Sequence, residues 1–197
     1  MRSSRIALAL LCGLAVAAPA AAEVFLSQRE ALALAFPAAD HIEKKSTLLD
    51  EAQARAVEQL SGAALESKLV TLHAGWRGDE LLGYALIDVH TVRTLPEAFL
   101  VVLSPDGIIQ SLRLLAFYEP SEYKPGERFL AQFGARNLGP ELRLGGAIHG
   151  IAGSSLSARA VTTGVRRSLA LYQVLVRGTA EAVELGSTPT PGAAGGR

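Results

Sequence analysis

The chain has 197 residues, of which 49% are hydrophobic and 19% are charged, and this fits one ordinary globular domain with its own core. Lys and Arg number 19 together, as do Asp and Glu, so the formal net charge is zero. Without a basic excess or a clustered basic stripe, the composition argues against a protein that binds nucleic acid.

The first 22 residues have the three-part pattern of a secretory signal peptide. Arg2 and Arg5 precede an apolar run at 6–18, and three alanines at 20–22 form a small-residue cleavage signature. We therefore expect export to the periplasm or the outer face of the membrane, with cleavage after Ala22. The alternative is an uncleaved N-terminal anchor, although the apolar run is short for a membrane span.

Cysteine and histidine usage excludes several chemistries. Cys12 is the only cysteine and lies inside the apolar run, so the exported chain has no disulfide, no thiolate metal site and no cysteine nucleophile. The four histidines lack the close spacing typical of metal ligands, and we predict no metal site. They are His41, His73, His90 and His149.

Two helices are predicted after the signal peptide. Ser27 and Glu30 form a capping box at the start of the segment 27–36. The segment 50–62 has acidic residues in its first turn and Gly62 just after its last turn, as helices commonly do.

Strands and further helices are then expected in chain order. Residues 68–76 and 81–92 flank the turn sequence RGDE, and residues 97–117 hold two apolar runs around SPDG, which indicates a second hairpin. A short helix is expected around 126–134 and a long one over 157–176. We predict an α+β fold with a mainly antiparallel sheet, N-terminal helices and a C-terminal helix.

The stretch HGIAGSSLSARAV, residues 149–161, places glycines and serines directly before the last predicted helix. A helix start offers unpaired amides and the positive end of the helix dipole, so Gly153, Ser154 and Ser155 fit a phosphate-binding site. The local pattern alone favours a plainer interpretation, in which Ser155 or Ser157 caps the helix.

This stretch also resembles the attachment motif of the FMN-binding domain family, which includes flavoprotein subunits of the sodium-pumping NADH:quinone reductase and its ferredoxin-linked relative. The family motif has the form Asp-x-x-Ser/Thr-Gly-Ala-Thr, and its last Thr is joined to FMN by a phosphoester that a dedicated flavin transferase installs. The same frame at 149–155 in this chain reads HGIAGSS. The residues that follow, and the upstream segment 83–123, are also similar to the family, so the resemblance covers about half of the chain.

The resemblance implies that FMN is attached to Ser155, where serine keeps the hydroxyl that a phosphoester needs. His149 stands where the family has Asp, and Ser154 stands where it has Ala. Non-covalent FMN, or a member that has lost the flavin, are the alternatives that the missing carboxylate raises.

The expected cofactor contacts come from three segments: the start of the last helix, the loop after the second hairpin, and the turn sequence HTVRT. They are His149, Gly153, Ser154, Leu156 and Ser157; Tyr118, Glu119 and Pro120; and His90, Arg93 and Thr94. The plainer alternatives are that His90 is a structural histidine, that Arg93 pairs with Glu97 on the surface, and that Ser157 caps the helix.

The sequence therefore predicts four regions: a signal peptide at 1–22, a helical and strand region at 23–80, an FMN-binding domain at 81–180 and a disordered tail at 187–197. The predicted function is that of an exported, membrane-associated electron-transfer flavoprotein. Its expected partners are the flavin transferase and a respiratory or periplasmic redox protein, for which a membrane protein is one option. The alternative is a non-catalytic accessory module of the same fold. A serine hydrolase is disfavoured because no Gly-x-Ser-x-Gly motif is present.

Overall fold

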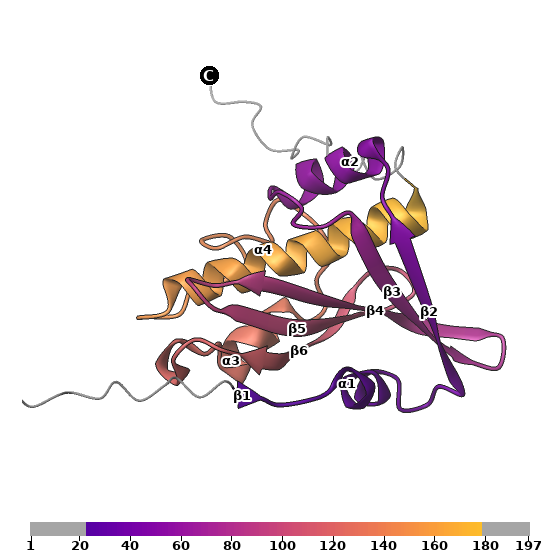
Figure 1. Cartoon of the computed structure of the whole chain (residues 1–197), viewed down its shortest axis with the longest axis horizontal. Helices are drawn as coiled ribbons and strands as arrows, with labels where there is room; N and C mark the ends of the chain where they lie inside the picture. Colours follow the sequence, from indigo (N-terminus) through magenta and orange to yellow (C-terminus); the bar gives the residue numbers. More distant parts are fainter. Residues whose placement is uncertain (1–22, 179–197) are drawn as a thin grey trace, which may run out of the picture.

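The computed structural model describes residues 23–178 and is built on one six-stranded antiparallel sheet (Figure 1). The strand order is β1-β6-β5-β4-β3-β2, so β2 to β6 form a meander and β1 pairs with β6 at the far edge. The strands are β1 (Glu23–Val24), β2 (His41–Leu48), β3 (Leu69–Arg77), β4 (Glu80–Thr91), β5 (Pro96–Leu103) and β6 (Ile109–Phe117). The predicted fold class is confirmed.

Helices cover both faces of the sheet. They are α1 (Gln28–Ala35), α2 (Glu51–Ser61), α3 (Glu127–Leu130) and α4 (Ser155–Tyr172), with short turns η1 (Ser121–Tyr123), η2 (Ala131–Phe133) and η3 (Gln173–Arg177, π-helical). α2 and α4 lie together on one face, and α1 lies on the other (Figure 1). Each long helix was expected from the sequence, and the segment predicted as one short helix at 126–134 is α3 followed by η2.

Helix starts and ends follow the expected residue types. Ser27 and Glu30 form the predicted capping box of α1. Asp50 and Gln53 form a second capping box at the start of α2, and Gly62 ends that helix with a left-handed φ of 75°, which favours glycine.

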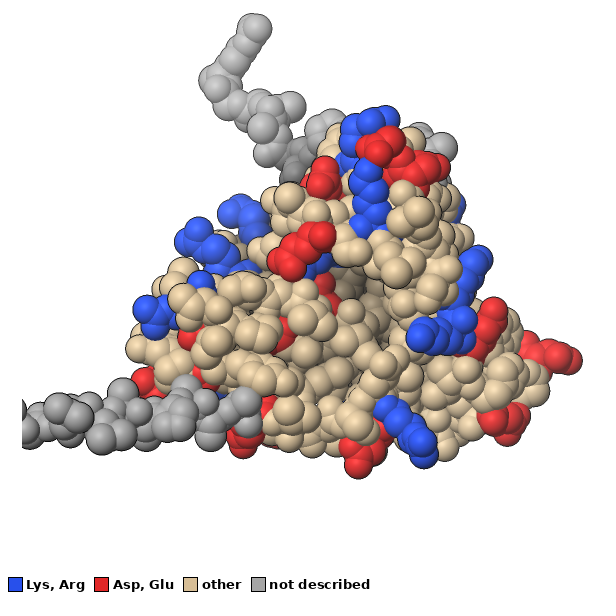
Figure 2. Space-filling view, viewed as in Figure 1, with Lys and Arg blue, Asp and Glu red and all other residues tan. Residues whose placement is uncertain are grey.

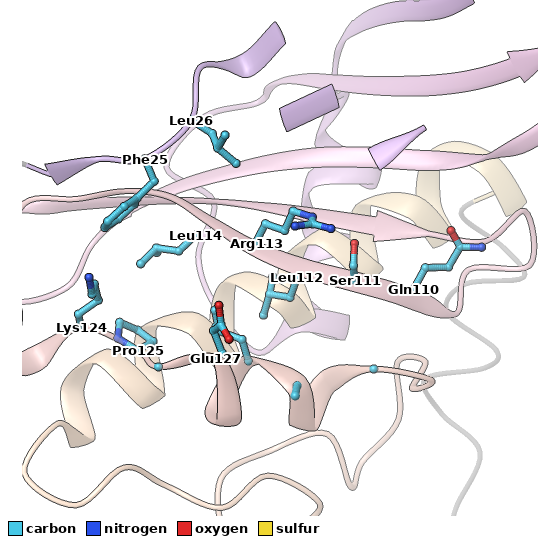
Figure 3. A pocket seen from close by; sticks show the side chains of 14 residues that line it. Phe25, Leu26, Gln110, Ser111, Leu112, Arg113, Leu114, Lys124, Pro125 and Glu127 are labelled. Carbon is cyan, nitrogen blue, oxygen red and sulfur yellow. The ribbon is translucent and has the colours of Figure 1, made fainter. Parts of the chain in front are cut away.

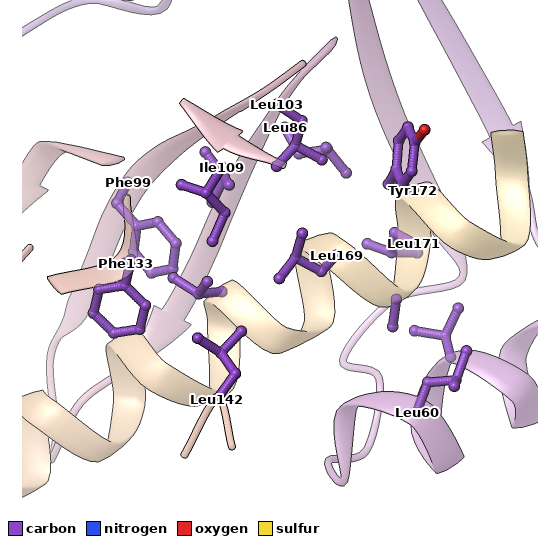
Figure 4. Close-up of a cluster of buried hydrophobic side chains, with 14 of the residues drawn as sticks. Leu60, Leu86, Phe99, Leu103, Ile109, Phe133, Leu142, Leu169, Leu171 and Tyr172 are labelled. Carbon is purple, nitrogen blue, oxygen red and sulfur yellow. The ribbon is translucent and has the colours of Figure 1, made fainter. Parts of the chain in front are cut away.

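The hydrophobic core has two parts, one on each face of the sheet. The larger part packs α4 and α2 on the sheet through residues such as Phe99, Ile109 and Leu169 (Figure 4). The smaller part lies under α1, where Leu32 and Phe36 contact the opposite face. Burial of α4 against the larger core fixes the direction in which its first turn points.

One prediction about element order is wrong. The sequence suggested two helices followed by the strands, but β2 lies between α1 and α2. Its sequence, HIEKKSTL, carries charged residues on both faces because β2 is an edge strand and is largely exposed, so it lacks the alternation of a half-buried strand. The two-residue strand β1 was also missed.

β3 and β4 separate toward one end of the sheet, and this opening is named the slot. Their pairing runs from Arg77/Glu80 to Leu72/Leu86 and stops there, whereas β3 continues with β2 and β4 continues with β5. A cavity of about 460 Å³ occupies the slot, and its walls include residues 69–71 and 86–89. Figure 2, which is viewed as Figure 1, shows a hollow near the middle of the molecule, with acidic and basic side chains around it.

The predicted boundary at residue 80 falls in the β3–β4 hairpin, so the regions 23–80 and 81–180 contribute strands to the same sheet. The predicted signal peptide and tail lie outside the described residues. Within residues 23–178, no helix is long and apolar enough to cross a membrane.

Candidate functional site

Three segments meet at one end of the molecule: the start of α4, the β4–β5 turn and the loop that follows β6. The Ser154 hydroxyl donates to the carbonyl oxygen of Glu122 at 3.2 Å, which ties the start of α4 to that loop. The Arg93 guanidinium lies 5.1 Å from the centre of the Tyr123 ring, which ties the loop to the β4–β5 turn. The structure thus brings together the three segments from which cofactor contacts were expected.

Glu119 holds the β4–β5 turn in place. Its Oε1 accepts the backbone N–H groups of Arg93 (3.0 Å), Thr94 (2.7 Å) and Leu95 (2.9 Å). Burial by itself would raise the pKa of Glu119, but the three N–H donors outweigh it and lower the pKa below its usual value. Glu119 therefore positions the β4–β5 turn, and Pro120 follows it in the loop, where its carbonyl accepts from the Tyr123 N–H at 2.9 Å.

Three serines lie at the start of α4, and one of them, Ser155, is exposed to solvent. Gly153 has a left-handed φ of 79°, and the helix begins at Ser155. Ser154 is 5% exposed and Ser157 is 1% exposed, whereas the Ser155 side chain is exposed. Leu156, beside it, is 48% exposed.

The predicted capping by Ser155 or Ser157 is wrong. The chain turns at Gly153, so the N-cap is Ser154, and its hydroxyl bonds to Glu122 instead of to helix amides. No side chain caps α4 at Ser154, so its first turn offers N–H groups of the kind that bind phosphate at helix starts.

The loop before α4 is held through its backbone at His149. The His149 N–H donates to Gln132 Oε1 at 2.8 Å, and its carbonyl accepts from Gln132 Nε2 at 3.1 Å. The side chain of His149 takes no part in these bonds. The loop therefore keeps its shape independently of which side chain stands at position 149.

A cavity of about 700 Å³ lies between β6, the residues after β1, and α3 (Figure 3). Its walls combine apolar side chains with charged ones: Phe25, Leu112, Leu114, Arg113, Lys124 and Glu127. Lys124 is two residues from Glu122, which bonds to Ser154, so the loop after β6 connects the cavity wall to the start of α4. Its volume falls within the range of cofactor-binding clefts.

None of these cavity residues was predicted as a site residue. The signal that could have found them is the turn pair Pro125-Gly126 directly before α3, in the same loop as Glu119 and Pro120. The contribution of β6 depends on which of its two faces α3 covers, which the local sequence does not specify.

His90 does not line this cavity but lies in the core, 6% exposed. Its Nδ1 is 2.7 Å from Asp88 Oδ1, and its Nε2 is 3.3 Å from Glu97 Oε2. The predicted surface pair of Arg93 and Glu97 is wrong, because Glu97 is fully buried opposite His90 in the β4–β5 ladder. Tyr118 lies beside the same ladder, and its N–H donates to the carbonyl of Pro96 at 3.2 Å.

The residues present fit FMN. Ser155 offers an exposed hydroxyl beside a glycine, and the open start of α4 offers N–H donors for a phosphate. The neighbouring cavity has apolar walls for a flat ring and two cationic side chains, Arg113 and Lys124. Among residues 23–178, no cluster of three or more His, Cys, Asp or Glu side chains could hold a metal ion.

Comparison with known proteins gives a likeness to a solved structure, and no likeness in sequence. No protein-family model matches the chain, and no curated protein matches it either. Among solved structures, the crystal structure of NqrC from Shewanella oneidensis aligns with a TM-score of 0.43 and 11% sequence identity, over 75% of this chain and 73% of NqrC.

Proposed function

We propose that this chain is an exported electron-transfer flavoprotein that carries FMN on Ser155 through a phosphoester. The observation that carries the proposal is the exposure of Ser155 at the first residue of α4. It is the one serine of the three at 154, 155 and 157 whose side chain is exposed, and it stands in the frame of the family's attachment motif.

The residues of the site have separate tasks in this proposal. Ser155 Oγ provides the link, and the N–H groups of the first turn of α4 bind the phosphate. Phe25 and Leu114 provide apolar walls of the cavity, and Lys124 provides a cation there. When bound, FMN supplies one-electron and two-electron transfer, and the protein sets its potential and exposure.

The replacement of the motif's Asp by His149 leaves this arrangement intact. Gln132 holds both backbone groups of His149, so the loop does not need a carboxylate there to keep its shape. A carboxylate at position 149 would instead promote the reaction by which the flavin transferase attaches FMN. We therefore propose that attachment occurs in this chain and that His149 lowers its extent.

The proposed partners are a flavin transferase and a redox protein of the respiratory chain or the periplasm. The second candidate function is a non-catalytic accessory module that has lost the flavin, and the presence of His149 at the motif's acidic position favours it. The colour of the protein separates the two, because a covalent flavin stays with the chain through denaturation and precipitation.

The decisive experiment is mass spectrometry of the tryptic fragment 144–159 after expression with a flavin transferase. We expect the mass of FMN on the wild-type fragment, its loss in Ser155→Ala and its retention in Ser157→Ala. His149→Asp should raise the modified fraction. An unmodified fragment in both the wild type and His149→Asp would overturn covalent attachment.

A further inference from the structure

A cluster of four ionisable side chains lies in the core, beneath the β4–β5 turn. Arg167 of α4 donates to both oxygens of Asp88, at 2.8 Å from Nε and 2.7 Å from Nη2. Asp88 also contacts His90 Nδ1, and the other ring nitrogen of His90 faces Glu97. These four groups are no more than 8% exposed, and they face one another from β4, β5 and α4.

The charges of this cluster balance only when one proton is shared between His90 and Glu97. Arg167 and Asp88 cancel each other, which leaves an imidazole and a carboxyl group 3.3 Å apart. With one proton the pair is either imidazolium with carboxylate or neutral imidazole with carboxylic acid, and both forms are neutral overall. Without that proton, an uncompensated negative charge would lie in the core, which is costly.

The surroundings of Glu97 fit a carboxyl group that exchanges a proton with His90. It is fully buried, and neither of its carboxylate oxygens makes a hydrogen bond within the described residues. His90 Nε2, the nearest polar atom of the cluster, is likewise without one. A proton on either His90 Nε2 or Glu97 Oε2 would form a hydrogen bond between these two atoms, which lack one otherwise.

The slot between β3 and β4 leads from the surface to this cluster. Asp88 and Arg167 are part of the wall of the 460 Å³ cavity that fills the slot. His90 contacts Asp88 through Nδ1, and Glu97 lies at the other ring nitrogen of His90. The cavity in the slot therefore reaches Asp88 and Arg167, whereas Glu97 is fully buried.

We propose that His90 and Glu97 together bind one exchangeable proton inside the domain, and that the slot is the route by which this proton exchanges with solvent. The transfer breaks an N–H bond at Nε2 and forms an O–H bond at Oε2, or the reverse, with no change of oxidation state. Burial by itself would lower the pKa of His90, but the hydrogen bond to Asp88 and the nearby carboxylates of Asp88 and Glu97 raise it to about 9.

The proton site lies next to the candidate cofactor site. His90 and Glu97 stand on either side of the β4–β5 turn, whose backbone Glu119 holds from the other loop. A change in the charge of the pair therefore acts on the turn that carries Arg93. This consequence for a bound flavin rests on the proposed function, whereas the proton site itself does not.

The test is an NMR titration of the imidazole groups in the full chain without flavin, with His90 assigned by its absence in His90→Gln. We expect His90 to titrate well above the ordinary value of ~6.5. Glu97→Gln keeps the size of the side chain but removes the carboxylate, so the proton affinity of His90 should fall at least tenfold. Glu43→Gln, a change on the exposed strand β2, is the matched control and should leave it unchanged.

The route is tested by filling the slot from β3. Thr71→Phe should slow the exchange of the His90 ring proton with solvent and leave the titration midpoint where it was. An unchanged exchange rate would overturn the slot as the route. A wild-type midpoint at or below ~6.5 would overturn the proton site, and this measurement needs neither a variant nor a bound cofactor.

Discussion

The first turn of α4 and the rest of the helix differ in burial. The first turn exposes Ser155 and Leu156 and has no side-chain cap, whereas Val161, Val165 and Leu169 farther along are fully or almost fully buried. From Ala158 onward the helix packs on the sheet and on α2. The side chains of Ser155 and Leu156 lie outside this packing, so a change at Ser155 removes no buried contact of the helix.

The adjacent residues Arg166 and Arg167 show how the rest of the helix is held. Arg166 donates to backbone carbonyls at the end of α2, on Leu60 and Ser61, and to those of Gly139 and Leu142. Arg167 points to the sheet and pairs with Asp88. Two neighbouring positions of one helix thus fix it to two different layers, and this is where substitutions should be most damaging.

The largest effect is expected from Asp88→Ala. The change leaves Arg167 and His90 buried without their shared partner, and breaking a buried pair in this way costs about 3–5 kcal/mol. Urea unfolding followed by circular dichroism measures the loss. Asp79→Ala, in the exposed β3–β4 turn, is the control and should change stability by less than about 0.5 kcal/mol. Equal effects of the two changes would contradict the central role of the cluster.

The second effect is a loss of stability at alkaline pH. Because the pKa of His90 is raised to about 9, its contribution is complete below ~6.5 and is lost as the pH rises through about 9. Burial raises the pKa of Glu97, which acts in the same direction. The free energy of unfolding should fall by at most roughly 3 kcal/mol over this window. His90→Gln should remove most of the slope, and an equal slope in that variant would assign it to other groups.

Much of the fold could be predicted because its signals are local. The capping box of Ser27, the glycine after α2 and the hairpin around SPDG each specify one element through neighbouring residues. β2 could not be recognised because an edge strand with many charges has no buried face to create a pattern.

The site could be predicted only where a short motif defines it. Short motifs in the sequence predicted the start of α4 and the Glu119 loop as site segments, and the structure brings these segments together, whereas the contact of Glu97 with His90 was not predicted. Glu97 faces His90 only because β4 and β5 pair in one particular register, and a shift by one residue would place it on the other face of the sheet. The cavity beside Lys124 likewise depends on β6 and α3 packing together.

The third effect concerns the close approach of α4 to the sheet. A Cβ atom at Gly164 would lie 2.6 Å from Asp88 Oδ1 and 2.7 Å from Phe99 Cζ. Gly164→Ala should therefore destabilise the protein by about 1–3 kcal/mol, although alanine is the better helix former. Thermal unfolding measures the change, with Thr163→Ala on the neighbouring, less buried position as the control. A more stable Gly164→Ala would show that the helix can move away from the sheet at little cost.

The smallest effect on stability is expected at Ser155, the residue to which we propose that FMN is attached. Ser155 is exposed, and its replacement removes no buried contact, so Ser155→Ala should change the free energy of unfolding by less than about 0.5 kcal/mol. Ser154→Ala removes the bond to Glu122 from a buried position and should cost about 1 kcal/mol. Chemical denaturation of the two variants without flavin, beside the mass of fragment 144–159 after expression with the transferase, separates the two roles. Ser155→Ala should lose the flavin and keep the fold, whereas Ser154→Ala should keep an attachment point and lose some stability. A marked loss of stability in Ser155→Ala would mean that the first turn of α4 supports the fold, and the contrast between this turn and the rest of the helix would then be wrong.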